Sequence, residues 1–428
     1  MKRSTGCDLE ALETAIRGAA LAAGAKVLEG LLDAVGTGRR GQAVRCACGA
    51  AMRSAGVRTK QVQTLLGRVS FARSRYRCAH CGNVRYPGDE ALSIVETSRS
   101  PGVRRQVARL GAKEPFEEVS KDLAEVAGIP LCRKEAERIS ERVGAAMEDW
   151  QENERVRLRL QPPPPPDAPR SLDTLYVEFD GTGVPMVPRE VAGRRGKQED
   201  GSARTREAKL GCVFTQHTFD EEGRPIRDRA STTFTGAIEP AARFGRRIYA
   251  EAVRRGLFEA RRVVVLGDGA EWVKNLASTH FGHGRFIVDY YHAKQHVTEL
   301  CRALFDHDIK RLNRYRDRWW DLLYEGDIET LTDQARAFLP RDKRAKKEAR
   351  TQIRYFEKNA RHMRYGQFRR EGLFIGSGVV EAGCKHVIGH RLKQSGMEWT
   401  VRGANDIIAL RCATLSNRAQ DFWEKDIA

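Results

Sequence analysis

The chain has no long apolar run. None of its apolar segments approaches the roughly 18–20 residues that a membrane-spanning helix needs, so the sequence excludes a transmembrane protein. The first ten residues also lack the apolar stretch of a secretory signal, and no internal repeat is visible. We therefore expect a cytoplasmic protein without a membrane partner.

Aromatic residues make up only 7% of the chain and acidic residues are outnumbered, yet the composition is not that of a disordered protein. Apolar residues amount to 41% of 428 residues, which suffices for two to four domains at roughly 100–200 residues each. The 75 Lys and Arg residues exceed the 57 Asp and Glu residues, so the net charge is +18. Such a surplus favours a polyanionic partner, above all nucleic acid.

One segment carries half of this surplus. Residues 341–370 contain 12 basic and 3 acidic residues. We interpret the segment as one that holds the DNA backbone, and a solvated helix face is the alternative. The residues expected to contact DNA there are Lys343, Arg344, Lys346 and Lys347.

Four of the ten cysteines form two pairs, Cys46-Ala-Cys48 and Cys78-Ala-His-Cys81, with 29 residues between them. Two such knuckles joined by a β-hairpin bring four sulfurs to one point, which is the ligand set that a structural Zn²⁺ prefers. His80 is a poorer ligand candidate, and four buried thiols without metal are the alternative. The remaining cysteines are expected to be small buried residues: Cys7, Cys132, Cys212, Cys301, Cys384 and Cys412.

Helical periodicity runs over residues 8–35 and again over 103–158. In the second stretch, Gly128-Ile-Pro130 separates two helical segments, as in a helix-turn-helix. Basic residues on the second segment are then candidates for DNA binding, although any packed helix pair looks similar. These basic residues are Arg133, Lys134 and Arg138.

Five prolines, Pro162 to Pro166, mark a stiff linker, and a different pattern follows it. Gly-, Ser- and Arg-rich residues 189–206 predict a loop. The remaining pattern predicts strands at 174–180, 209–219 and 224–234, a helix at 239–255, a strand at 262–268, a helix at 270–280, a strand at 285–289 and helices from 292 to about 368. A last helix opens after Gly376-Ser377-Gly378. This order is ribonuclease-H-like.

Carboxylates stand at three informative places in this order. Asp180 ends the first strand, Asp268 ends the buried fourth strand, and Glu381 lies in the first turn of the last helix. In the predicted fold the first and fourth strand ends lie side by side, and the helix crosses beside them. Three clustered carboxylates repel one another unless cations bind, so we expect two Mg²⁺ or Mn²⁺ ions for in-line phosphoryl displacement. Asp289 and His292 end the next strand and are expected to brace the cluster or to contact DNA, and Glu178 shares the polar strand face with Asp180.

Several segments together resemble the ISKra family of bacterial insertion-sequence transposases, relatives of the Mutator-type enzymes. They are Leu266-Gly-Asp268-Gly-Ala-Glu-Trp272, Val288-Asp-Tyr-Tyr-His-Ala-Lys294, Gly376-Ser-Gly-Val-Val-Glu381-Ala-Gly-Cys-Lys385 and Arg391-Leu-Lys-Gln-Ser-Gly-Met-Glu-Trp399. The resemblance implies a catalytic triad of two aspartates and a glutamate at Asp180, Asp268 and Glu381, and an Asp-x-x-His element at Asp289 and His292. Lys385, Arg391 and Lys393 in these segments are expected to bind DNA.

The resemblance also implies the organisation of the chain. We expect an N-terminal helix over 1–39, a zinc ribbon over 40–95, a helical DNA-binding region over 100–160, a linker over 161–170 and a ribonuclease-H-like domain over 171–428. A helical insertion is expected at about 293–372. The implied activity is binding of terminal inverted repeats, cleavage of double-stranded DNA and strand transfer to target DNA, by a dimer or larger oligomer that is nucleoid-associated when bound.

Two alternatives remain open at this point. A two-metal nuclease of the same fold would hydrolyse DNA without strand transfer. A non-catalytic DNA-binding regulator derived from a transposase would use the same binding regions without the carboxylate site.

Overall fold

The computed structural model describes residues 8–162, 172–196, 198–199 and 201–424. The chain divides into two compact units, Met1–Val143 and Gly144–Ala428, which we call the N-terminal and C-terminal units. The division lies inside the helix α5 (Arg133–Leu160). Most of the predicted proline-rich linker, residues 163–170, lies outside the described residues. No helix in the described part of the chain is long and apolar enough to cross a membrane.

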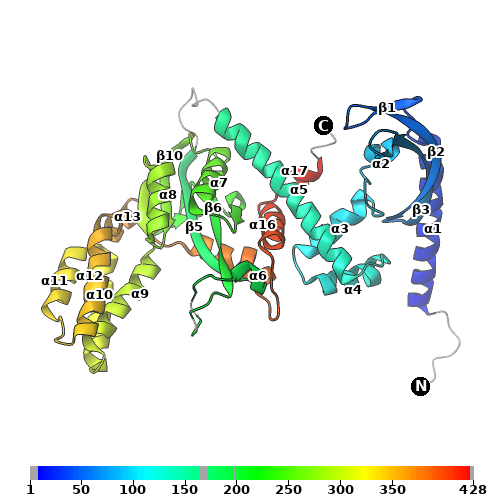
Figure 1. The fold of residues 1–428 in the computed structure, drawn as a ribbon. Helices are drawn as coiled ribbons and strands as arrows, with labels where there is room; N and C mark the ends of the chain where they lie inside the picture. The colour runs from blue at the N-terminus through cyan, green and yellow to red at the C-terminus, as the bar shows by residue number, and fades with distance from the viewer. Residues whose placement is uncertain (1–7, 163–171, 197, 200, 425–428) are drawn as a thin grey trace, which may run out of the picture. The chain divides into compact units, whose positions relative to one another are not determined.

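The N-terminal unit begins with the predicted long helix. Helix α1 (Leu9–Val35) starts at Asp8, whose side chain accepts a hydrogen bond from the Glu10 N–H, and ends at Gly36. It packs on an antiparallel sheet through a small apolar cluster that includes Ala25 and Phe71. The sheet has the order β1-β2-β3-β4, with β1 (Ala43–Arg45), β2 (Ala51–Thr64), β3 (Gly67–Cys78) and β4 (Val84–Arg85) (Figure 1).

Short helices follow the sheet: α2 (Pro87–Ala91), α3 (Pro101–Gly111) and α4 (Phe116–Ala127). Helix α4 ends at Gly128, which has a φ of 64° and so favours glycine. Helices α4 and α5 thus occupy the two segments of the predicted helix-turn-helix. That this pair reads DNA stays a prediction.

The C-terminal unit is built on a five-stranded sheet with the order β11-β10-β5-β6-β9. Strands β10 (Ala260–Gly267) and β11 (Arg285–Val288) run parallel to β5 (Leu172–Pro185), whereas β6 (Thr205–Gln216) and β9 (Thr233–Ala237) complete an antiparallel half. Strand β5 therefore lies in the middle of the sheet. Its side chains are buried on both faces from residue 174 to residue 179.

Helices cover both faces of this sheet. Helices α7 (Ala241–Arg254) and α8 (Glu271–Phe281) pack on the face to which Val177 and Phe179 point. Helix α14 (Gly378–Gly383), a π-helical turn (Cys384–Gly389) and α15 (His390–Leu392) continue one another on the opposite face, and α16 (Val401–Leu415) and α17 (Ala419–Glu424) follow. The predicted last helix thus contains a π-helical turn, a feature often found at functional sites.

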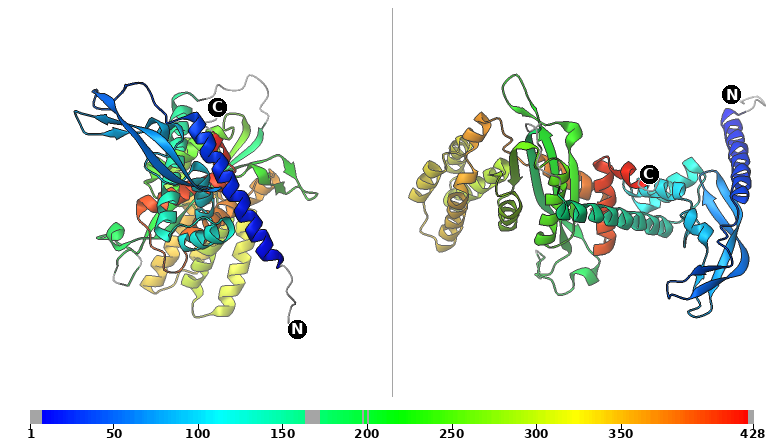
Figure 2. Two further views of the ribbon diagram at one scale, coloured as in Figure 1. Left: turned by 90° about the vertical axis from the view of Figure 1, so that its right-hand side faces the viewer. Right: turned by 90° about the horizontal axis from the view of Figure 1, so that it is seen from above.

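Five helices stand between β11 and α14, at the place of the predicted insertion. They are α9 (Tyr290–Phe305), α10 (Ile309–Glu325), α11 (Ile328–Ala337), α12 (Lys343–Asn359) and α13 (Tyr365–Arg370). In Figures 1 and 2 these yellow-green to orange helices form a bundle beside the green sheet.

The predicted hairpin around residues 220–223 is wrong in its extent. Only the two-residue strands β7 (Thr218–Phe219) and β8 (Pro225–Ile226) pair across that turn. The returning strand that pairs with β6 is β9, because a 3₁₀ turn (Arg229–Ser231) interrupts the chain before it. The Thr215 hydroxyl donates a hydrogen bond to the Asp228 carboxylate beside this turn (2.6 Å). The predicted loop 189–206 contains part of the short helix α6 (Pro188–Val191), and β6 already begins within it.

The cysteines outside the two knuckles are mostly buried, as predicted: Cys212, Cys301, Cys384 and Cys412. Cys132 is the exception, since it is exposed just before α5. Cys7 lies outside the described residues.

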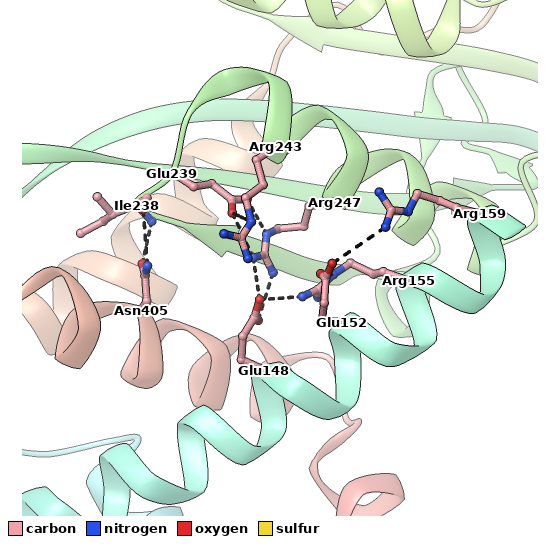
Figure 3. A network of polar contacts seen from close by, with 9 residues as sticks. All are labelled: Glu148, Glu152, Arg155, Arg159, Ile238, Glu239, Arg243, Arg247 and Asn405. Atoms are coloured by element: carbon pink, nitrogen blue, oxygen red, sulfur yellow. Dashed lines mark hydrogen bonds and ion pairs between the residues drawn. The ribbon is translucent and has the colours of Figure 1, made fainter.

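A buried charge network fixes the second half of α5 to the C-terminal unit (Figure 3). Arg247 of α7 donates two hydrogen bonds to Glu148 of α5, at 2.7 and 3.0 Å, and two to Glu239, at 2.7 and 3.3 Å. Arg155 donates to the same Glu148 at 2.6 Å. Close packing adds to this attachment, because a Cβ atom on Gly144 would lie 2.0 Å from the Asp406 carbonyl oxygen.

Candidate functional site

The structure brings the four knuckle cysteines together. Their sulfur atoms all lie within 4.8 Å of one another, and the Sγ atoms are 3.5 Å apart in the pair Cys46–Cys81 and 3.7 Å apart in Cys48–Cys78. Tetrahedral Zn–S bonds of ~2.3 Å require sulfurs ~3.8 Å apart, so the cluster fits a zinc ion. Hydrogen bonds from the backbone N–H groups of Cys81 and His80 lower the pKa of Cys78, whereas the neighbouring thiols raise the pKa of Cys81.

Asp180 and Asp268, the two predicted metal-binding aspartates, lie at the same level of the five-stranded sheet. Glu178 of β5 pairs with Leu266 of β10 in parallel register, so two residues further on Asp180 stands beside Asp268. Gly267 pairs in turn with Val288 of β11, which places Asp289 next to Asp268. Asp268 and Asp289 directly follow the ends of β10 and β11, whereas β5 continues to Pro185, so the prediction that Asp180 ends its strand is wrong. Asp180 lies where the parallel pairing of β5 with β10 stops, and the three aspartates stand in one row.

Helix α14 brings Glu381 to this row. It packs over β5 and β6, where the Glu178 carboxylate accepts a hydrogen bond from the Val380 N–H at 2.9 Å. Glu381 follows Val380 directly and is exposed. The helix therefore presents its carboxylate beside Asp180.

The pKa shifts of the carboxylates agree with this arrangement. Burial raises the pKa of Asp180, and the negative charge of Asp268 adds to the increase. Burial also raises the pKa of Glu381, and the charges of Asp289 and Asp180 add to it. Divalent cations would relieve this mutual repulsion.

The three carboxylates are more widely spaced than the four sulfurs. Among the described residues, only the cysteine cluster has its ligand atoms all within 4.8 Å of one another. Two cations roughly 3.5–4 Å apart do not need one tight cluster, because each contacts only some of the ligands. The residue types and their location in and beside this row therefore fit a pair of Mg²⁺ or Mn²⁺ ions.

Asp289 braces the site. It is buried, its Oδ1 accepts from the His292 N–H at the start of α9 (2.6 Å), and its Oδ2 accepts from the Ser377 N–H and hydroxyl. Both carboxylate oxygens are thus engaged within the protein. Of the two predicted roles, bracing is the one that these contacts favour.

His292 links the carboxylates to the helical insertion. Its Nε2 lies 3.2 Å from Nε2 of His296, whose Nδ1 lies 2.7 Å from the Gln352 side chain of α12. The His296 ring stacks on Tyr355 with centroids 3.7 Å apart. Helices α9 and α12 therefore contribute side chains to the immediate surroundings of the site.

The predicted DNA-contacting residues differ in exposure. Lys385 and Lys393 are exposed on the helical segment that carries Glu381, and the Lys393 ammonium donates to the Thr182 hydroxyl of β5. Arg391 is fully buried, with its guanidinium beside the Trp399 ring, so the prediction that it binds DNA is wrong. The residues on either side of Arg391 in the sequence do not show which face of the segment packs inward, so its burial could not be predicted from them.

The other basic candidates are accessible. On α12, Lys343, Arg344 and Lys347 are exposed and Lys346 is half-buried. On α5, Arg133, Lys134 and Arg138 are exposed, and Lys134 forms a 2.7 Å ion pair with Glu137.

Sequence reasoning missed a second basic region, in the cysteine sheet. Residues 39–86 contain eleven Lys and Arg residues and no Asp or Glu. Strand register places Arg53 directly opposite Arg77, and Arg58 opposite Arg73. Like charges in facing positions destabilise a sheet. Arg73 is already paired with Asp89, so Arg53 and Arg77 are the facing arginines that a bound anion would stabilise. A count of acidic residues along the chain would have revealed this region.

Comparisons with known proteins identify similarity to an uncharacterised group. The model of the uncharacterised protein family UPF0236 matches residues 255–424. A "UPF0236 protein in vanSb 3'region" of Streptococcus gallolyticus is 24% identical over 374 residues, covering 83% of this chain and 73% of that protein. A UPF0236 protein of Caldanaerobacter subterraneus is 23% identical over 366 residues, which cover 82% of this chain and 67% of that protein. The name of that protein joins eleven designations.

These findings correct the family assignment. The resemblance to the ISKra family was wrong, because the family model that matches is UPF0236 and the relatives carry that name. Short motifs around carboxylates were too weak a basis for choosing a family. The geometry of the carboxylates does not depend on that choice.

Proposed function

We propose that this chain is a metal-dependent DNA transposase that cleaves DNA and transfers the cut strand. The observation that carries the proposal is the row of carboxylates on neighbouring strands, Asp180 beside Asp268, with Glu381 presented by α14. The strand order supports a ribonuclease-H-like catalytic domain. The first strand of the sheet, β5, lies in its centre, with the parallel strands β10 and β11 on one side and the antiparallel pair β6 and β9 on the other.

Each carboxylate has a role in this proposal. From neighbouring strands, Asp180 and Asp268 would hold divalent cations, and Glu381 would complete their coordination. Such cations, when bound, supply a nucleophile at neutral pH and stabilise the charge of the displaced oxygen. Lys385 and Lys393 would bind the phosphates on either side of the cut, because both are exposed next to the carboxylates.

The charge distribution supports double-stranded DNA as the partner. The cysteine sheet and α12 both present basic residues, and a duplex neutralises many such charges at once. Binding two DNA ends together would require a dimer or a larger oligomer. The eleven designations joined in one relative's name also support the proposal, because many copies in one genome are typical of mobile elements.

Arginines on the cysteine sheet should contribute to DNA affinity. We expect the double change Arg53→Ala and Arg77→Ala to weaken binding to duplex DNA. The slope of log affinity against log salt should fall by about 1 for each phosphate that the protein no longer neutralises. Fluorescence anisotropy with a labelled duplex at several salt concentrations measures both. Lys26→Ala is the matched control, since Lys26 is exposed and already paired with Glu29. An unchanged slope in the double variant would contradict this role.

The proposed function is tested with purified protein, end-labelled linear DNA that includes the sequences flanking its own gene, and Mg²⁺ or Mn²⁺. Wild type is compared with Asp268→Asn on a sequencing gel. We expect metal-dependent cuts and joined products from wild type and neither from the variant. Cuts without joined products would indicate a two-metal nuclease instead. Binding without cleavage by either protein would indicate a DNA-binding regulator.

A further inference from the structure

The segment that carries Glu381 has little structure of its own to fix it. It begins with Gly376-Ser377-Gly378, and glycines leave the backbone free to adopt many conformations. Helix α14 has only six residues before the π-helical turn begins. Its position must therefore come from contacts with the rest of the unit.

The usual local cap of this helix is absent. A Ser at the N-cap normally accepts a hydrogen bond from the N–H two or three residues later. Here the Ser377 hydroxyl donates to Asp289 Oδ2 at 2.8 Å, and within the described chain its side chain accepts nothing from the helix. The N–H of Val380, three residues after Ser377, is bound instead by a carboxylate from a distant strand.

That carboxylate belongs to Glu178. Its Oε2 accepts from the Val380 N–H at 2.9 Å, and the thiol of Cys212 on β6 lies 3.8 Å from the same oxygen. Glu178 is fully buried in the middle of the central strand, between β6 and β10. Two residues along this strand stands Asp180.

We propose that Glu178 is a positioning residue that caps α14 from the sheet and thereby holds Glu381 in register with Asp180. The same rigid strand then carries both one metal ligand and the anchor of another. Asp289 fixes the start of the segment at Ser377, so two buried carboxylates fasten it at successive points. The inference rests on the proposed function only in taking Glu381 as a metal ligand.

The role depends on a hydrogen-bond acceptor at this position. Glu178→Gln keeps an oxygen that can accept from Val380, and the other carboxylate oxygen, Oε1, has no hydrogen-bond partner among the described residues. Glu178→Leu has a similar size but no acceptor. Outer-shell hydrogen bonds of this kind typically change metal affinity about 10- to 100-fold when removed.

The experiment measures Mn²⁺ affinity by calorimetry and hydrogen exchange of the Val380 amide by NMR or mass spectrometry, on the full chain. We expect Glu178→Gln to resemble wild type in both. Glu178→Leu should bind Mn²⁺ about 10- to 100-fold more weakly and lose protection at Val380. Cys212→Ala is the matched control, because it removes the other contact of Oε2 and leaves the bond to Val380 intact.

Three outcomes would overturn the inference: wild-type affinity and protection in folded Glu178→Leu, equal losses in folded Glu178→Gln, or an unprotected Val380 amide in wild type. If Glu178→Leu fails to fold, the glutamine variant and wild-type exchange still decide it. Wild type that binds no Mn²⁺ would count against the proposed function instead, and Val380 exchange would still test the capping contact.

Discussion

If the four cysteines bind zinc, as we propose, removing the metal is expected to unfold the cysteine sheet of the N-terminal unit. The apolar cluster around the knuckles is small, with only Cys46, Met52, Tyr76 and Cys78 buried in it. Strands β1 and β4 have three and two residues. Structural zinc contributes about 10 kcal/mol or more to the folding of small domains of this kind, far more than this cluster can supply.

Circular dichroism and thermal unfolding of the full chain, with and without a strong chelator under reducing conditions, measure the effect. We expect one zinc per chain by atomic absorption, and loss of both zinc and the sheet's unfolding transition in Cys78→Ser. Cys132→Ser is the control, because Cys132 is exposed and outside the cluster. Metal-free, reduced protein that melts like the purified form would show that the four thiols need no metal to hold the sheet.

Breaking the charge network on α5 should strongly destabilise the C-terminal unit. Arg247→Ala would remove the main partner of the buried Glu239 carboxylate and one of the two arginines that pair with the half-buried Glu148. Removing one member of a buried ion pair typically costs about 3–5 kcal/mol, because the remaining charge is not solvated. Urea unfolding followed by Trp fluorescence measures the loss.

The exposed Arg243 is the matched control for this change. It pairs with the same Glu239 from the solvent side at 3.2 Å. An exposed pair contributes at most about 1 kcal/mol, so Arg243→Ala should unfold nearly like wild type. Equal losses in the two variants would contradict the importance of burial.

The same network predicts a dependence on pH. Burial alone would raise the pKa of Glu148, but Arg247 and Arg155 outweigh it and hold the pKa below its ordinary value. The stability that this pair contributes is therefore complete above the ordinary carboxyl pKa and is lost as the pH falls through the lowered one. Urea unfolding between pH 6 and pH 3 should show a steeper decline for wild type than for a Glu148→Gln variant.

The sequence by itself determined the features that depend on residues close to one another along the chain. Cysteine spacing predicted the four-sulfur cluster, because knuckle geometry is set within a few residues. The strand pattern predicted that Asp180 and Asp268 lie side by side, because it placed both on neighbouring parallel strands, although β5 runs on to Pro185.

Only the tertiary structure decided which distant groups are partners. Glu178 binds a backbone N–H 202 residues away, and Glu148 meets Arg247 across 99 residues. The sequence predicted that Arg391 contacts DNA, but in the structure its side chain is buried beside Trp399. Spacing and periodicity are local, whereas a side chain's partner depends on how whole elements pack, so no pattern around these residues could have revealed their roles.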